Sequence, residues 1–108
     1  MGLDQYAFAV KGDEKVEIAY WRKHANLEGY MSELWRSRGN KGEFNCEELE
    51  LDIEDLMDLR DNHRNLKTSQ GFFWGQSYPE DIEDTEKFIK RALEEISKGC
   101  KIIYTSWW

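Results

Sequence analysis

The sequence is poor in cysteine, proline and histidine: its 108 residues include two cysteines, one proline and two histidines. Cys46 and Cys100 lie far apart, and neither has a companion at the Cys-x-x-Cys spacing of a zinc or redox site. A reduced intracellular protein is the simplest interpretation, and a single disulfide between the two is also compatible with the sequence. We expect neither a metal ion nor another cofactor.

The sequence also lacks the apolar segments of membrane and secreted proteins. No apolar run approaches the roughly 20 residues that span a bilayer. The first residues, Met1–Tyr6, have neither the basic start nor the apolar stretch of a secretory signal. These absences predict a cytoplasmic protein without a membrane partner.

Positive charge is in deficit, with 15 lysines and arginines against 22 aspartates and glutamates and a net charge of -7. Because phosphate neutralisation needs clustered cations, we expect no direct nucleic-acid binding. Acidic surface charge keeps a protein soluble. It can also attract a basic protein face, or imitate DNA and so occupy a DNA-binding protein.

Hydrophobic residues are present in normal amount, at 40% of the chain, and aromatic residues reach 14%. A chain of this length and composition can bury a core without a metal or a disulfide. We therefore expect one domain over residues 1–108.

Apolar alternation predicts a β-hairpin near the amino-terminal end. Between Leu3 and Trp21, apolar residues recur at every second position on both sides of a turn that contains Gly12. The next segment has apolar residues at helical spacing and ends in arginines and Gly39, which predicts a helix over Ala25–Ser37.

Two further helices and a closing strand are indicated. Asp52 is placed to cap a helix that continues toward Asn65. Pro79, as first helical residue, and Gly99, as stop signal, delimit another helix. β-branched and aromatic residues then predict a strand over Cys100–Trp108.

These elements predict an α+β fold, in which a small, mainly antiparallel sheet of the amino-terminal hairpin and the carboxyl-terminal strand is covered by about three helices. The segment Phe44–Leu51 is ambiguous and is compatible with a short extended stretch.

Six motifs follow one another along nearly the whole chain: Met1–Tyr6, Tyr20–Lys23, Asn45-Cys46, Thr68–Gly75, Asp84-Thr85 and Tyr104–Trp107. Together they resemble a family of small, uncharacterised proteins of bacteriophages and bacterial prophage regions. The resemblance implies a phage-type accessory protein in the host cell cytoplasm, with no known activity. Family members usually carry Met at the position of Gln5, and His and Trp at the positions of Glu28 and Tyr30.

The segment Gln70–Gly75 holds three consecutive aromatic residues between glycines. Glycines let a backbone approach a ligand, and aromatic faces stack on a base, a sugar or a partner side chain. Alternatively, the rings seal a junction between helix and sheet, which we favour for Phe72 and Phe73. Trp74 is the ring that we expect to be exposed.

A basic and aromatic cluster occurs at Tyr20–Lys23. Arg22 and Lys23, next to Trp21, have the chemistry to hold a carboxylate or phosphate with cation–π support. The alternative is that these cations pair with neighbouring acids on the surface.

Cys46 is a candidate nucleophile, with His24 or His63 as base and Asn45 as oxyanion donor. Free cysteine is, however, commonly a small buried residue. We therefore do not favour an enzymatic role.

Acidic residues are densest at 47–58 and 80–86, without the spacing of an EF-hand. The simpler interpretation is that these acidic residues lie on solvated helix faces. The more specific interpretation is that they form a charge array like that of DNA. Of the final residues, we expect Trp107 to pack in the sheet and Trp108 to contact a partner.

We therefore expect a non-enzymatic protein that binds a host or phage protein through an aromatic surface. Its predicted contacts are Trp21, Arg22, Trp74, Tyr78 and Trp108. One alternative is a pocket for an anionic metabolite where the turn at 71–75 meets Tyr20, Arg22 and Asn45, and another is an acidic DNA mimic. The full set of candidate binding residues is Tyr20, Trp21, Arg22, Lys23, Asn45, Cys46, Gln70, Trp74, Tyr78 and Trp108.

Overall fold

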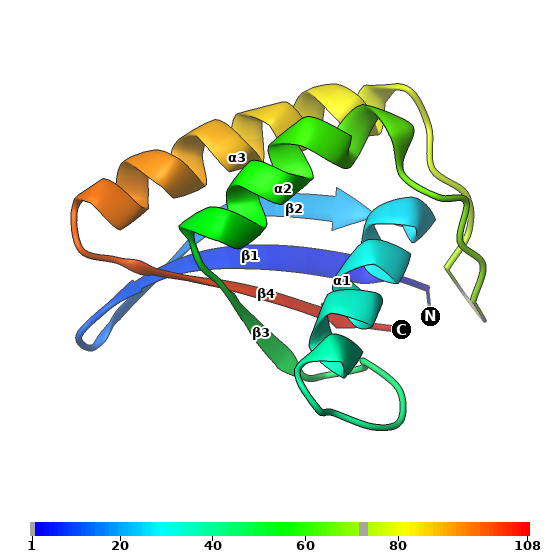
Figure 1. The fold of residues 1–108 in the computed structure, drawn as a ribbon, viewed down its shortest axis with the longest axis horizontal. Helices are drawn as coiled ribbons and strands as arrows, with labels where there is room; N and C mark the ends of the chain where they lie inside the picture. The colour runs from blue at the N-terminus through cyan, green and yellow to red at the C-terminus, as the bar shows by residue number, and fades with distance from the viewer. Residues whose placement is uncertain (1, 72–73) are drawn as a thin grey trace.

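The computed structural model describes residues 2–71 and 74–108, which adopt the predicted α+β fold. Figure 1 shows the arrangement of helices and strands. Within the described ranges the elements are β1 (Asp4–Lys11), β2 (Glu14–Arg22), α1 (Ala25–Ser37), β3 (Glu48–Leu51), α2 (Ile53–Asn62), a short 3-10 helix η1 (His63–Asn65), α3 (Glu80–Ser97) and β4 (Lys101–Trp107).

The described strands form one four-stranded sheet in the order β2-β1-β4-β3, in which every neighbouring pair is antiparallel. The predicted hairpin is β1 and β2, and Gly12 takes the positive φ of 60° that its turn requires. The closing strand, β4, lies between β1 and β3. The ambiguous segment contributes β3, whose Leu49 and Leu51 alternate inward with two exposed glutamates.

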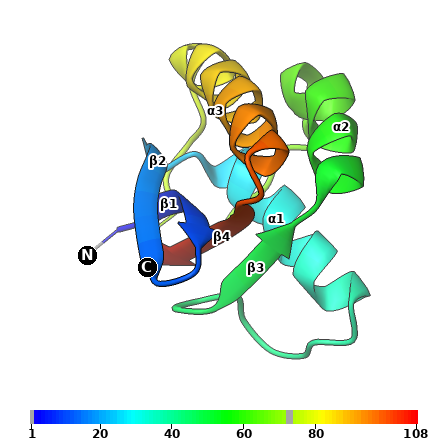
Figure 2. The same cartoon turned by 90° about the vertical axis from the view of Figure 1, so that its left-hand side faces the viewer.

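The three helices named above lie on the same side of the sheet (Figures 1 and 2). The alternation of burial agrees with this one-sided arrangement, because every second residue of β1 and β4 is buried. The buried set is Gln5, Ala7 and Ala9 in β1, and Ile102, Tyr104 and Ser106 in β4. The opposite sheet face is therefore not covered by any described helix.

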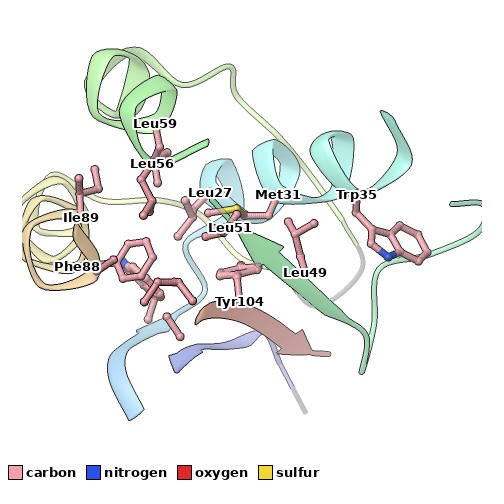
Figure 3. Close-up of a cluster of buried hydrophobic side chains, with 14 of the residues drawn as sticks. Leu27, Met31, Trp35, Leu49, Leu51, Leu56, Leu59, Phe88, Ile89 and Tyr104 are labelled. Carbon is pink, nitrogen blue, oxygen red and sulfur yellow. The ribbon is translucent and has the colours of Figure 1, made fainter. Parts of the chain in front are cut away.

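The core lies between the sheet and the helices, as Figure 3 shows. Its aliphatic part combines Leu27 and Met31 of α1 with leucines of β3 and α2. Its aromatic part includes Trp21, which meets Phe88 of α3 edge to face at 5.1 Å between ring centroids. Burial of these large side chains is the main stabilising contribution to the fold.

The helix boundaries follow the sequence signals closely. Helix α1 spans the predicted residues. Helix α2 begins with a capping box, in which Asp55 N donates to Asp52 Oδ1 at 2.8 Å and Asp52 N donates to Asp55 Oδ2 at 3.0 Å. This helix ends at Asn62 and tightens into η1, so the regular helix is shorter than predicted. Helix α3 begins at Glu80, one residue after the predicted start at Pro79.

Among the helices that the structure describes, none has both the length and the apolar character needed to cross a bilayer.

Candidate functional site

The uncovered side of the sheet is here called the open face. It carries the outward residues of all four strands. These are Asp4, Tyr6, Phe8 and Val10 of β1; Lys15, Glu17, Tyr20 and Arg22 of β2; Glu48 and Glu50 of β3; and Lys101, Ile103, Thr105 and Trp107 of β4. A register shift between Ala7 and Phe8 turns Ile18 toward the core.

Aromatic side chains gather on the open face. The rings of Tyr6 and Phe8 stack at 6.2 Å, and those of Tyr6 and Tyr20 meet at 5.2 Å. Tyr20 is 44% exposed and Trp107 is 59% exposed. Soluble proteins seldom leave several aromatic rings together in water, so the open face is the candidate site.

The open face is hollowed into a trough with a volume of about 720 Å³. Its lining consists of Tyr6, Phe8, Lys15, Glu17, Cys46, Glu47, Glu48, Thr105 and Trp107. Lys15 Nζ lies 4.5 Å from the centroid of the Phe8 ring and 3.3 Å from Glu48 Oε2. The aromatic floor of the trough therefore already holds one cation of this chain.

The Lys15–Glu48 pair joins the two outermost strands of the sheet. In a flat sheet of this register their backbones would lie about 20 Å apart, beyond the combined reach of the two side chains. The contact is possible because the sheet twists, which brings these diagonal corners together over the open face. The trough is therefore a consequence of sheet twist.

Arg22, at the end of β2, forms an ion pair within the chain. Arg22 Nη1 lies 3.6 Å from Asp4 Oδ1, and the same oxygen accepts a 2.6 Å hydrogen bond from the hydroxyl of Tyr20. This hydrogen bond to a carboxylate is the main reason that the pKa of Tyr20 is raised. The sequence alternative of a surface ion pair at Arg22 is thus the arrangement observed.

Two predicted contact residues, Trp21 and Trp74, are buried, so the expectation that the Trp74 ring is exposed is wrong. Trp21 is 2% exposed, and its Nε1 donates to Thr85 Oγ1 at 3.2 Å. Trp74 is 9% exposed and packs against Leu3, Ala25 and Trp108. Both rings are drawn inward because a large apolar surface is more stable out of water.

Trp107 is exposed, against the expectation that its ring packs in the sheet, whereas a partner contact of Trp108 stays a prediction. Trp107 points to the open face because β4 buries its even-numbered residues. Trp108 is half-buried, donates from Nε1 to the carbonyl of Phe44 at 3.0 Å, and meets Trp74 edge to face at 5.7 Å.

Several motif segments converge where the ends of β1, β2 and β4 meet. Lys23 N donates to the carbonyl of Leu3 at 2.9 Å. Asn45 holds the backbone of Trp108 with both side-chain atoms, accepting from its N–H at 2.9 Å and donating to its carbonyl at 3.1 Å. Lys23 and Cys46 take the left-handed φ values of 59° and 60°. These contacts give Asn45 and the Lys23 backbone a structural role.

Neither histidine pairs with Cys46 among the hydrogen bonds that the structure describes. Cys46 is exposed at the trough, and its Sγ lies 3.7 Å from Asn45 Oδ1. His24 Nδ1 lies 2.6 Å from Ser77 Oγ, whereas His63 contacts the carbonyl of Arg60 and a carboxylate of α3. Neither histidine is thus placed to act as the base of a Cys46 nucleophile.

His24, Ser77 and Asp81 come together without forming a catalytic triad. Ser77 Oγ and Asp81 Oδ2 lie 2.6 and 3.8 Å from the same nitrogen, Nδ1 of His24. A triad places its serine and its carboxylate at opposite nitrogens of the imidazole. Burial lowers the pKa of His24, an effect that Asp81 and Asp84 oppose. Ser77 Oγ also accepts from the N–H of Asn26 at 2.9 Å, which ties the loop to α1.

A polar cavity of about 480 Å³ lies where the loop before α3 meets α1. Its described lining is Asn26, Thr68, Ser69, Gln70, Gly71, Gly75, Gln76 and Ser77. Gly71 and Gly75 border this cavity, but Tyr20, Arg22 and Asn45, which were expected beside them, are not in its described lining. No cationic side chain occurs among this described lining.

Other predicted residues also lie away from the trough. Tyr78 is exposed as expected, but it precedes α3 on the helical side and borders a smaller cavity beside His24. Phe72 and Phe73 lie outside the described residues, so their predicted packing stays a prediction.

A buried polar network connects the sheet with α1 and was not foreseen from the sequence. Gln5 Nε2 donates to the hydroxyl of Tyr104 at 2.9 Å. That hydroxyl and Ser106 Oγ donate to the two carboxylate oxygens of Glu28, at 2.6 and 2.7 Å. Burial raises the pKa of Glu28, and these hydrogen bonds oppose the rise. In the sequence each of these polar side chains looks like an ordinary surface residue, so the residue pattern did not point to a buried network.

Part of the dense acidic run is engaged in local interactions. Asp52 and Asp55 form the capping box of α2, and Asp55 also pairs with Arg38. Asp58 accepts a hydrogen bond from the hydroxyl of Tyr30. These carboxylates therefore stabilise the fold, which leaves fewer of them for a DNA-like array.

No family model, curated protein or solved structure matches the chain. The resemblance to small phage proteins stays a prediction.

Proposed function

We propose that this chain is a non-enzymatic accessory protein of phage type that binds a host or phage protein through the open face of its sheet. The observation that supports this proposal most directly is the cluster of Tyr6, Phe8, Tyr20 and Trp107 on a sheet face that no described helix covers. The aromatic contact surface thus lies on different residues from most of those expected.

The aromatic composition of this face suits protein recognition. Tyrosine and tryptophan supply large contact areas at low conformational cost, and they are enriched among residues that dominate binding energy. Tyr20 and Trp107 lie on either side of β1, so one partner surface can contact both. The anionic-metabolite alternative has less support, because the cavity beside Gly71 and Gly75 has no cation in its described lining.

The test uses photo-cross-linking from the trough. A benzophenone maleimide is attached to Cys46 in a Cys100→Ser background, and the labelled protein is irradiated in a lysate of a bacterial host. The matched control carries the same label on α3, in a Cys46→Ser, Cys100→Ser, Lys87→Cys variant. Lys87 is exposed on the helical layer, away from the open face.

We expect at least one cross-linked protein that forms from position 46 and not from position 87. The same product should be lost when Tyr20→Ser and Trp107→Thr are combined with the Cys46 label, because both rings leave the contact surface. Identical products from both positions, or products that persist in the doubly substituted protein, would contradict the proposal.

A further inference from the structure

The trough already contains one cation held by this chain, and its position shows what kind of group the trough accepts. Lys15 Nζ lies over the Phe8 ring at 4.5 Å and pairs with Glu48 Oε2 at 3.3 Å. An ammonium group is stabilised here by an aromatic face and a carboxylate together.

The rest of the trough lining offers the same two features, aromatic surface and a carboxylate, without such a cation. Tyr6 and Trp107 supply aromatic surface there, and Glu47 supplies a carboxylate. Among the described residues, no lysine or arginine forms an ion pair with Glu47 or with Glu17 on the opposite wall. The trough therefore has an excess of negative charge beyond what Lys15 neutralises.

We propose that the trough binds a segment of a partner protein that places an arginine side chain against Tyr6 and Trp107, with its guanidinium at the carboxylate of Glu47. This inference rests on the proposed function and names the chemistry of the partner. Arginine fits better than lysine because its planar guanidinium both stacks on aromatic rings and forms paired hydrogen bonds with a carboxylate.

The internal cation leads to a specific consequence. Lys15 occupies one aromatic face and one carboxylate of the trough, so it repels a second cation that enters nearby. Removing its charge should end this repulsion and leave the charge of Glu48 unneutralised, which increases the attraction of the trough for an arginine. The Lys15→Gln variant should therefore bind an arginine probe more tightly than the unmodified protein does.

The experiment titrates the isotopically labelled protein with short peptides and follows its amide and indole NMR signals. The probes are acetyl-Gly-Arg-Gly-amide, its isosteric citrulline counterpart, and acetyl-Gly-Phe-Gly-amide. We expect the arginine peptide to shift the Trp107 indole signal and the Tyr6 amide, and the neutral citrulline peptide to bind more weakly.

Two matched substitutions distinguish the carboxylate of Glu47 from general surface charge. Glu47→Gln should weaken the arginine peptide about two- to fivefold, whereas Glu94→Gln, at an exposed site on α3, should leave its affinity unchanged. Lys15→Gln should strengthen binding by about twofold or more.

The outcomes also distinguish this inference from the proposed function. Equal binding of the arginine and citrulline peptides, or equal effects of the two glutamate substitutions, would overturn the arginine assignment, whereas cross-linking from Cys46 would still support a protein partner. Binding of the phenylalanine peptide alone would also overturn the arginine assignment, and it would show that the open face binds aromatic groups and not cations. Signals that shift with protein concentration in the absence of peptide would identify a second copy of this chain as the occupant, and no shift with any probe would overturn the inference.

Discussion

The hydroxyl of Tyr104 donates a 2.6 Å hydrogen bond to Oε1 of Glu28, so a strand of the sheet and the first turn of α1 share one buried carboxyl group. Glu28 is fully buried, and no lysine or arginine among the described residues pairs with it. Its solvation in the interior therefore comes from hydroxyl groups, with Ser106 as the second donor.

Stability should depend on pH through Glu28. Burial raises the pKa of its carboxyl above the value of about 4.3 expected in the unfolded chain. The folded state then holds the proton more tightly, so this contribution to stability is complete below pH of about 4.3 and is lost as pH rises through the folded pKa.

Glu28→Gln removes this titration while keeping the shape of the side chain. In urea unfolding measured from pH 4.5 to 8, the free energy of unfolding of the variant should gain on that of the wild type as pH rises, by up to about 1.4 kcal/mol per pH unit below the folded pKa. Glu94→Gln, on the exposed side of α3, is the control and should run parallel to the wild type. Parallel curves for both variants would contradict a raised pKa at Glu28.

Gln5 and Glu28 both form a hydrogen bond with the hydroxyl of Tyr104, which connects them. Gln5 also accepts from the N–H of His24 at 2.8 Å and donates to its carbonyl at 3.0 Å. Gln5→Met leaves the His24 N–H without this partner, and we expect a loss of about 1–3 kcal/mol in the free energy of unfolding.

A double-mutant cycle tests whether the two positions act as one network. Gln5→Met and Glu28→Gln should be non-additive by at least about 0.5 kcal/mol, because both alter the hydrogen bonds of the same Tyr104 hydroxyl. The control pair is Gln5→Met with Glu94→Gln, which should add. Additivity in both pairs would show that Tyr104 does not couple Gln5 to Glu28.

Replacing Trp21 should destabilise the fold far more than replacing Trp107, although both residues lie in strands. Trp21→Ala removes a buried ring that contacts Phe88 and Thr85, and should cost about 3–5 kcal/mol in the free energy of unfolding. Trp107→Thr changes an exposed ring to another strand-forming residue and should stay within about 0.5 kcal/mol of the wild type. Urea unfolding at pH 7 measures both, and a large loss for Trp107→Thr would show that its ring packs against the fold.

The fold was predictable because its signals are local. Apolar periodicity defined the hairpin and Ala25–Ser37, and Asp52 marked the start of α2 through a capping box that spans four residues. Residues 44–51 were ambiguous because a four-residue edge strand depends on pairing with β4, which is distant in the sequence.

The site was less predictable, because the exposure of an aromatic ring depends on strand register. Trp107 and Trp108 are adjacent and chemically equal, and only the inward position of Ser106 decides which of them faces water. The period of two in a strand places Tyr6 and Phe8 on one face. The local sequence does not determine which face of the sheet the helices cover. The position of Tyr6 and Phe8 in the trough therefore follows only from the assembled sheet.

The two cysteines should differ in reactivity, and the difference reports on the trough. Cys46 is exposed in the trough lining, whereas Cys100 is half-buried and its Sγ lies 3.8 Å from Glu95 Oε2. We expect a thiol reagent to modify Cys46 about tenfold faster than Cys100, because access and a nearby carboxylate both disfavour attack at Cys100. Rates measured on Cys46→Ser and Cys100→Ser assign each phase.

Occupancy of the trough by the acetyl-Gly-Arg-Gly-amide probe should slow the Cys46 phase and leave the Cys100 phase unchanged. A Cys46 rate that ignores the probe would place peptide binding elsewhere on the protein, even if other signals shift.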